Sequence, residues 1–117
     1  MVRIDNELGT VSICSDVFTN LAGDAATRCF GVKGMAGRSK ESGLVQLLRR
    51  ESMSKGVIVT FNEDGDVSIG LHIAVDRGVN LLALSESIRG EVAYKVQAAT
   101  GVPVGRVDVY VDSMHID

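Results

Sequence analysis

The segment from Gly56 to Asn80 constrains the fold most, because it contains two alternating apolar runs separated by a polar turn. Apolar side chains at every second residue indicate a strand that places one face on a core. The first run spans Val57 to Phe61, and the second spans Val67 to Val75. The turn, Asn62 to Asp66, contains a glycine that can adopt a positive φ angle. We therefore predict a β-hairpin, which needs further elements to cover its apolar face.

A short strand and a helix are predicted in the N-terminal part of the chain. Residues Gly9 to Cys14 alternate as a strand does. Either Ser15 or Asp16 can then cap a helix, whose alanine-rich apolar stripe runs to about Cys29. We expect Gly31 to end this helix.

The next segment, Gly31 to Gly43, is the most polar and glycine-rich part of the chain. We expect it to form a surface loop that carries a local positive cluster of Lys33, Arg38 and Lys40. The residues from Leu44 to about Met53 have the apolar spacing of a short second helix.

A long helix and a final strand follow the hairpin. Leu81 to Thr100 has apolar residues at helical spacing, with Asn80 as a capping residue before it and Gly101 after it. Gly90 interrupts the helix, and the sequence offers no reason for it beyond a close packing contact. Arg106 to Asp112 alternates valines with polar residues, as expected of a strand.

The resulting order, β-α-(α)-β-β-α-β, predicts a single domain over residues 1–117. It indicates an α+β two-layer sandwich, with a four-stranded, mostly antiparallel sheet and the helices on one face.

Composition limits the function classes. The net charge is −3 and aromatic residues make up 4% of the chain, so neither general attraction to nucleic acid nor a base-stacking surface is expected. No apolar run approaches the roughly 20 residues that span a bilayer. The start of the chain lacks the apolar region of a signal peptide. These features predict a cytoplasmic protein without a membrane span of its own.

No catalytic, cofactor or metal site is predicted. His72 and His115 lack acidic or thiol neighbours at catalytic or ligand spacing, so we interpret both as surface histidines. Cys14 and Cys29 fit no metal spacing and are separated by roughly 20 Å of predicted helix, at about 1.5 Å per residue, so they are expected to be free thiols. The acidic residues of the hairpin turn lack the spacing of a calcium loop.

One motif supports an alternative. Gly31-Val32-Lys33-Gly34 lies between two predicted helices, as the GXXG loop of a KH module does when it binds single-stranded nucleic acid. However, the residues between this motif and the second predicted helix depart from KH geometry.

A series of short motifs in order spans nearly the whole chain: Ile4-Asp5-Asn6, Gly9 to Ile13, Leu21 to Ala26, Cys29 to Met35, Ser54 to Val57, Gly78-Val79-Asn80, Thr100-Gly101 and Val107 to Val111. Through these motifs the chain resembles the alkaline-shock-protein family of Gram-positive bacteria, in its short YloU-like form.

The resemblance implies a non-enzymatic protein linked to envelope stress, which acts as a scaffold and forms homo-oligomers. It also implies partners: related family members, a small membrane-anchored protein that would hold it at the inner face of the membrane, or a fatty-acid or dihydroxyacetone-type kinase. No catalytic residues are carried over from the family.

The candidate interaction residues are therefore the basic cluster of Lys33, Arg38 and Lys40, and the outer face of the last strand, which carries Arg106, Asp108 and Tyr110. An unpaired edge at that strand would allow self-association. The same polar residues would equally serve solubility, and an enzyme would need a partner to supply acid–base groups.

Overall fold

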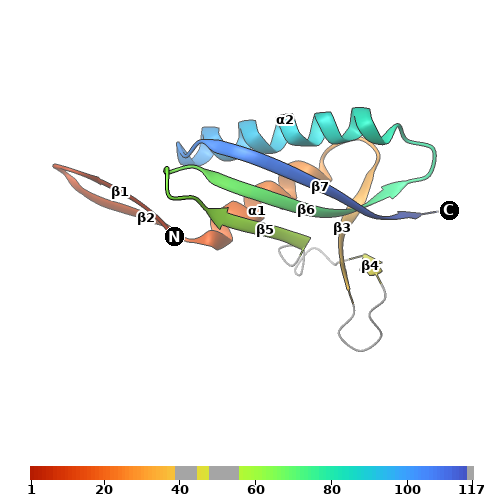
Figure 1. Cartoon of the computed structure of the whole chain (residues 1–117), viewed down its shortest axis with the longest axis horizontal. Helices are drawn as coiled ribbons and strands as arrows, with labels where there is room; N and C mark the ends of the chain where they lie inside the picture. Colours follow the sequence, from red (N-terminus) through yellow and green to blue (C-terminus); the bar gives the residue numbers. More distant parts are fainter. Residues whose placement is uncertain (39–44, 48–55, 116–117) are drawn as a thin grey trace.

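The computed structural model describes residues 1–38, 45–47 and 56–115. In order, the elements are β1 (Val2–Asn6), β2 (Gly9–Ile13), α1 (Ser15–Thr27), β3 (Val32–Arg38), β4 (Val45–Leu47), β5 (Val57–Phe61), β6 (Val67–Asp76), α2 (Leu81–Thr100) and β7 (Val104–His115). Both helices cover one face of the main sheet (Figure 1). The predicted α+β two-layer class is thus confirmed.

Strand β6 is the centre of the main sheet. Its first half pairs antiparallel with β5 and its second half with β3, while β7 runs parallel to it along its whole length. Because β7 occupies one side of β6, β3 and β5 follow one another along the other side. The short strand β4 extends this sheet from β3. Within the described residues, β7 therefore has a paired edge towards β6 and an unpaired edge.

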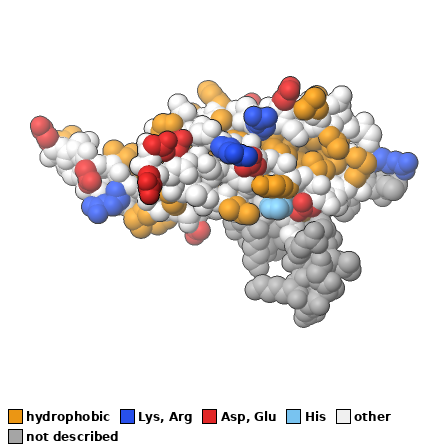
Figure 2. All heavy atoms as spheres, in the orientation of Figure 1, with side chains coloured by type: hydrophobic (Ala, Val, Ile, Leu, Met, Phe, Trp, Pro, Cys, Tyr) orange, Lys and Arg blue, Asp and Glu red, His pale blue; other side chains and the backbone are white. Residues whose placement is uncertain are grey.

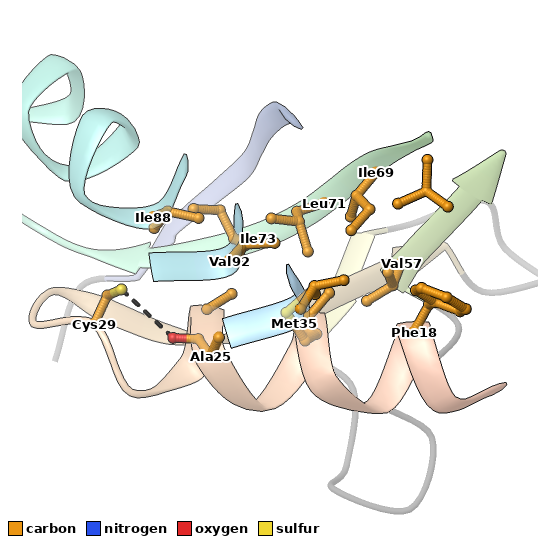
Figure 3. Packing of buried hydrophobic residues seen from close by; sticks show 14 of the residues in the cluster. Phe18, Ala25, Cys29, Met35, Val57, Ile69, Leu71, Ile73, Ile88 and Val92 are labelled. Atoms are coloured by element: carbon orange, nitrogen blue, oxygen red, sulfur yellow. Dashed lines mark hydrogen bonds between the residues drawn. The ribbon is translucent and has the colours of Figure 1, made fainter. Parts of the chain in front are cut away.

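The core lies between the sheet and the helices (Figure 3). Leu71 and Ile73 of β6 are fully buried, as the alternation of the predicted hairpin requires. Phe18 of α1 packs edge-to-face on Phe61 of β5, with ring centroids 5.5 Å apart. The small side chains on α1, such as Ala22, let this helix approach the sheet closely.

Helix α2 begins and ends where the sequence predicts. The side chain of Asn80 accepts a hydrogen bond from the backbone N–H of Ala83, at 3.0 Å. At the other end, Gly101 adopts a left-handed conformation with φ of 76°, and its N–H donates to the carbonyl of Gln97. Glycine is the favoured residue there because it has no Cβ atom to clash in the left-handed conformation.

An N-terminal arm, residues 2–13, projects from the body as a β-hairpin of β1 and β2 (Figure 1). Val2 and Ile13 anchor its base against the core. Beyond them the arm is exposed, and Leu8 at its tip is 98% exposed. The sequence interpretation recognised β2 but not β1, although Val2 and Ile4 alternate with Arg3 and Asp5.

Three predictions before the central hairpin are wrong. The expected loop from Gly31 contains β3, because the second half of β6 offers this segment a pairing edge. Val45–Leu47, expected to be helical, forms β4; the rest of that predicted helix lies outside the described residues. In the main sheet, β3 takes the place expected for the strand at Gly9.

Helix α1 also differs at both ends from the prediction. Its capping residue is Cys14, whose side chain makes no capping hydrogen bond, so neither Ser15 nor Asp16 caps the helix. It ends at Thr27, before the predicted end near Cys29. The turn that follows is closed by a hydrogen bond from the Cys29 N–H to the Ala26 carbonyl.

Candidate interaction surface

The outer face of β7 carries the predicted interaction residues Arg106, Asp108 and Tyr110 side by side, because alternate residues of a strand share a face. Arg106 Nε donates to both carboxylate oxygens of Asp108, at 2.9 Å each. This carboxylate raises the pKa of the Arg106 guanidinium. Both side chains are substantially exposed, so their charges are available to a partner.

His72 of β6 joins this face. Its Nδ1 lies 2.9 Å from Asp112 Oδ2, and because a carboxylate only accepts, the imidazole donates. Its ring stacks on Tyr110, with centroids 4.7 Å apart and planes 16° from parallel. His72 thus lies on the outer face, as the alternation of β6 predicts, but the expectation that it lacks an acidic neighbour is wrong. Figure 2 shows this side of the molecule, where apolar and charged side chains are interspersed.

The contact between His72 and Asp112 could not be predicted from residue spacing. His72 and Asp112 are 40 residues apart in the sequence and meet because β6 and β7 pair in parallel. Alternation predicts both strands but not their register.

Among the residues that the structure describes, no group of three or more acidic, histidine or cysteine side chains is arranged to hold a metal ion.

A groove of about 830 Å³ runs between α2 and the first half of β7. Its helix wall is formed by Ser85, Glu86, Arg89, Gly90 and Ala93, and its strand wall by residues 104–109. Gly90 is exposed, and a side-chain carbon placed on it would meet nothing within 4 Å. The close packing contact considered for Gly90 is therefore absent from the described residues; this glycine instead widens the groove.

Of the predicted basic cluster, the structure describes the side chain of Lys33 alone. Lys33 lies on β3 and its Nζ is 3.9 Å from Asp76 Oδ1. Arg38 is the last residue of β3, and Lys40 lies outside the described residues. Because Val32 to Gly34 belong to a strand, the loop on which the KH interpretation depends is not formed between helices.

A cavity and an exposed apolar side chain lie where the turn after α1 meets the turn before α2. Phe30, in the first of these turns, is 96% exposed. Beside Phe30 is a cavity of about 550 Å³, which Val79 and Leu84 also line. Cavities lined partly by apolar side chains are common binding sites. Sequence patterning does not reveal this cavity, because Phe30 and Val79, which both line it, are 49 positions apart in the chain.

The two cysteines are free, as predicted, and differ in environment. Cys14 is exposed at the junction between the arm and α1. Cys29 is buried, and its Sγ lies 3.5 Å from the Ala25 carbonyl, to which it donates (Figure 3). Burial raises the pKa of the Cys29 thiol, which keeps it protonated and unreactive.

The sequence matches one family model and is similar to proteins of two bacteria. The sequence model of the alkaline-shock-protein family, which is described as having a "cell envelope-related function", matches residues 3–116. The uncharacterized protein YloU of Bacillus subtilis (strain 168) is 29% identical over 116 residues, which cover 98% of this chain and 96% of YloU. The uncharacterized protein Spy1614 of Streptococcus pyogenes serotype M6 is 30% identical, over 98% of this chain and 95% of its own length.

No solved structure matches the chain significantly. In the described part of the chain, neither helix has the length and apolar character needed to cross a membrane.

Proposed function

Because the chain belongs to the alkaline-shock-protein family, whose function is related to the cell envelope, we propose that it is a non-enzymatic scaffold protein of the envelope stress response. In this role it associates with itself and with a partner that is membrane-anchored or acts in lipid metabolism. The observation that carries the proposal is the edge of β7 that faces away from β6: it pairs with no strand among the described residues, and it borders an open groove.

An unpaired strand edge supports self-association for a physical reason. Its free backbone N–H and C=O groups can pair with a strand of another chain, and proteins that remain monomeric usually block such edges. Here the edge belongs to a 12-residue strand whose register with β6 shifts at Gly105 and at Asp112. Between these two positions Val107, Val109 and Val111 face the core, so the edge carries no inward-pointing charge there. The groove beside it gives an added strand a place for its side chains, as in peptide recognition by strand addition.

The cavity beside Phe30 suits the membrane-anchored or lipid-metabolism partner. It adjoins the exposed Phe30 side chain, and no residue of β7 lines it. Binding there would leave the strand edge free, so self-association and partner binding are compatible.

A photo-crosslinking amino acid at Phe30 should capture a membrane protein in cells, whereas the same group at exposed Glu63 in the hairpin turn should not. Equal yields from the two positions would contradict this assignment.

Self-association is tested with a pair of proline substitutions, Val109→Pro and Tyr110→Pro. In a strand, neighbouring N–H groups point to opposite edges, so one proline removes a bond to β6 and the other removes a donor from the free edge. We expect the variant that retains the native circular dichroism spectrum to sediment as a smaller species than the wild type in analytical ultracentrifugation. The proposal would be contradicted by a wild-type protein that stays monomeric at about 100 μM, a concentration about a hundredfold above a micromolar dissociation constant.

A further inference from the structure

The N-terminal arm is an amphipathic hairpin with no cover on its apolar face within the described residues. Directly paired residues share a face, so Ile4 lies beside Val11 on one side, while Arg3 and Asp5 lie on the other. Ile4 is 40% exposed and Val11 is 56% exposed. A two-stranded hairpin is marginally stable on its own in water, so an exposed arm of this kind needs a surface to pack on.

Strand β1 and strand β7 carry the same charge pattern. Arg3-Ile4-Asp5 and Arg106-Val107-Asp108 each place an arginine and an aspartate on one face and an apolar residue between them on the other. In each strand the arginine also approaches its own aspartate, with 3.9 Å between Arg3 Nη2 and Asp5 Oδ1. Such exposed pairs contribute little stability, so they can exchange partners at small cost.

We propose that β1 of one copy adds to the free edge of β7 of a second copy, antiparallel, with Ile4 opposite Val107. This rests on the self-association proposed above and assigns its two surfaces. In this register Arg3 faces Asp108 of the second copy and Asp5 faces Arg106. Parallel addition would place like charges opposite each other, which is destabilising.

The groove fits this occupant. Val107 points towards the helix layer, so the residue opposite it points the same way. Ile4 of the arm therefore enters the space between β7 and α2, where Gly90 and Ala93 present little bulk. The arm thereby buries its apolar face, and its polar face continues the outer face of the second copy's sheet.

The interface is heterologous, because the arm and the groove are different surfaces. A copy that receives an arm still has its own arm to donate, so successive copies add head to tail. A symmetric β7-to-β7 contact would instead close at two copies. The two arrangements therefore differ in stoichiometry and in their response to substitution.

Charge reversal distinguishes them. The double substitution Arg3→Asp/Asp5→Arg reverses the arm, and Arg106→Asp/Asp108→Arg reverses the edge. We expect each variant alone to associate at least about tenfold more weakly at low salt, because two attractive cross-strand pairs become repulsive. The chain that carries both reversals should associate as the wild type does, since every pair is again opposite in charge.

An equimolar mixture of the arm-reversed and the edge-reversed variant provides the second test. The normal arm of one variant fits the normal edge of the other, and the two reversed surfaces also fit each other. We therefore expect the mixture to form assemblies that neither variant forms alone.

The symmetric β7 contact makes a different prediction for the edge-reversed variant. In such a contact centred on Val107, position 106 of each copy faces position 108 of the other. Reversing both charges would then leave every facing pair opposite in sign, and association would persist. Full association of the edge-reversed variant alone would therefore overturn the arm assignment.

Thermal unfolding of each variant should match the wild type, because the reversed residues are on exposed faces. If the wild type associates and arm reversal leaves its sedimentation unchanged, the arm assignment is wrong while self-association stands. If the wild type does not associate, both proposals fail.

Discussion

The two β-hairpins of this protein have the same local design and opposite surroundings. In β5–β6, Val57 pairs with Leu71 and the apolar face lies on the core. In β1–β2, Ile4 pairs with Val11 and the apolar face is exposed. The alternation of side chains therefore determines that a hairpin forms, but the elements around it determine whether its apolar face stabilises the fold or remains available to another molecule.

Hydrogen exchange should show the largest difference between the hairpins. The amides that join β5 to the first half of β6 are expected to exchange only through global unfolding, because β6 is the central strand of the main sheet. Amides of β1 between Arg3 and Asn6 should exchange through local opening, with free energies near zero in the monomer. Exchange measured at a concentration where the protein is monomeric checks this. Equal protection in the two hairpins would mean that the arm packs on the body.

Truncating one buried and one exposed side chain should separate the hairpins next. Leu71→Ala leaves a cavity in the core and should lower the free energy of unfolding by about 2–5 kcal/mol. Val11→Ala removes apolar atoms from an exposed face and should change it by less than about 0.5 kcal/mol. Urea denaturation of both variants measures the difference. A large loss for Val11→Ala would show that the arm contributes to the folded monomer.

The turns provide a smaller contrast. Asn62 Nδ2 donates to Asp66 Oδ1 at 2.7 Å, which is the main reason that the pKa of Asp66 is lowered. Because the folded pKa lies below the unfolded one, this stabilisation is present above the unfolded pKa and is lost as the pH falls through the folded pKa. Asn62→Ala should raise the pKa of Asp66 towards its ordinary value and lower the stability slightly at neutral pH.

NMR titration of the Asp66 carboxyl measures this change. The matched variant is Asn6→Ala in the arm, where the Asn6 side chain accepts from the Leu8 N–H. It should leave global stability unchanged, since the arm opens locally. An unchanged Asp66 pKa in Asn62→Ala would show that another donor lowers it.

The smallest expected difference is in the reactivity of the two cysteine thiols. Cys14, beside the exposed arm, should react rapidly with a thiol reagent, whereas Cys29 should react only on unfolding. Because the folded pKa of Cys29 is raised, the stability linked to its protonated form is present below the unfolded pKa and is lost as the pH rises through the folded pKa. Mass spectrometry of partly labelled protein identifies the modified cysteine. Equal labelling of both residues in native protein would contradict the burial of Cys29.

The success of sequence reasoning depended on how local each signal was. Asn80 and Gly101 are caps that act within a turn of the helix end, so α2 was predicted at both ends. The polar, glycine-rich segment Gly31 to Gly43 predicts a loop, since glycine is a poor strand former, and only pairing with the distant edge of β6 makes Val32–Arg38 a strand.

The candidate interaction surface shows the same limit. The alternation of β7 predicts only that Arg106, Asp108 and Tyr110 share one face. The contact of His72 with Asp112 required the β6–β7 register, and the groove required α2 to lie beside β7. Neither follows from residue spacing, because each brings together segments from different parts of the chain.

The position of β7 beside β6 has a consequence for biosynthesis. Helix α2 separates the two strands, so the parallel pair joins Ser68 to Arg106 across 38 residues of chain. Contacts over such separations form slowly because a long loop must close first. During translation β6 is therefore made well before β7 and waits with one edge open. The nascent chain is most exposed to wrong strand pairing, and to chaperone capture, in that interval.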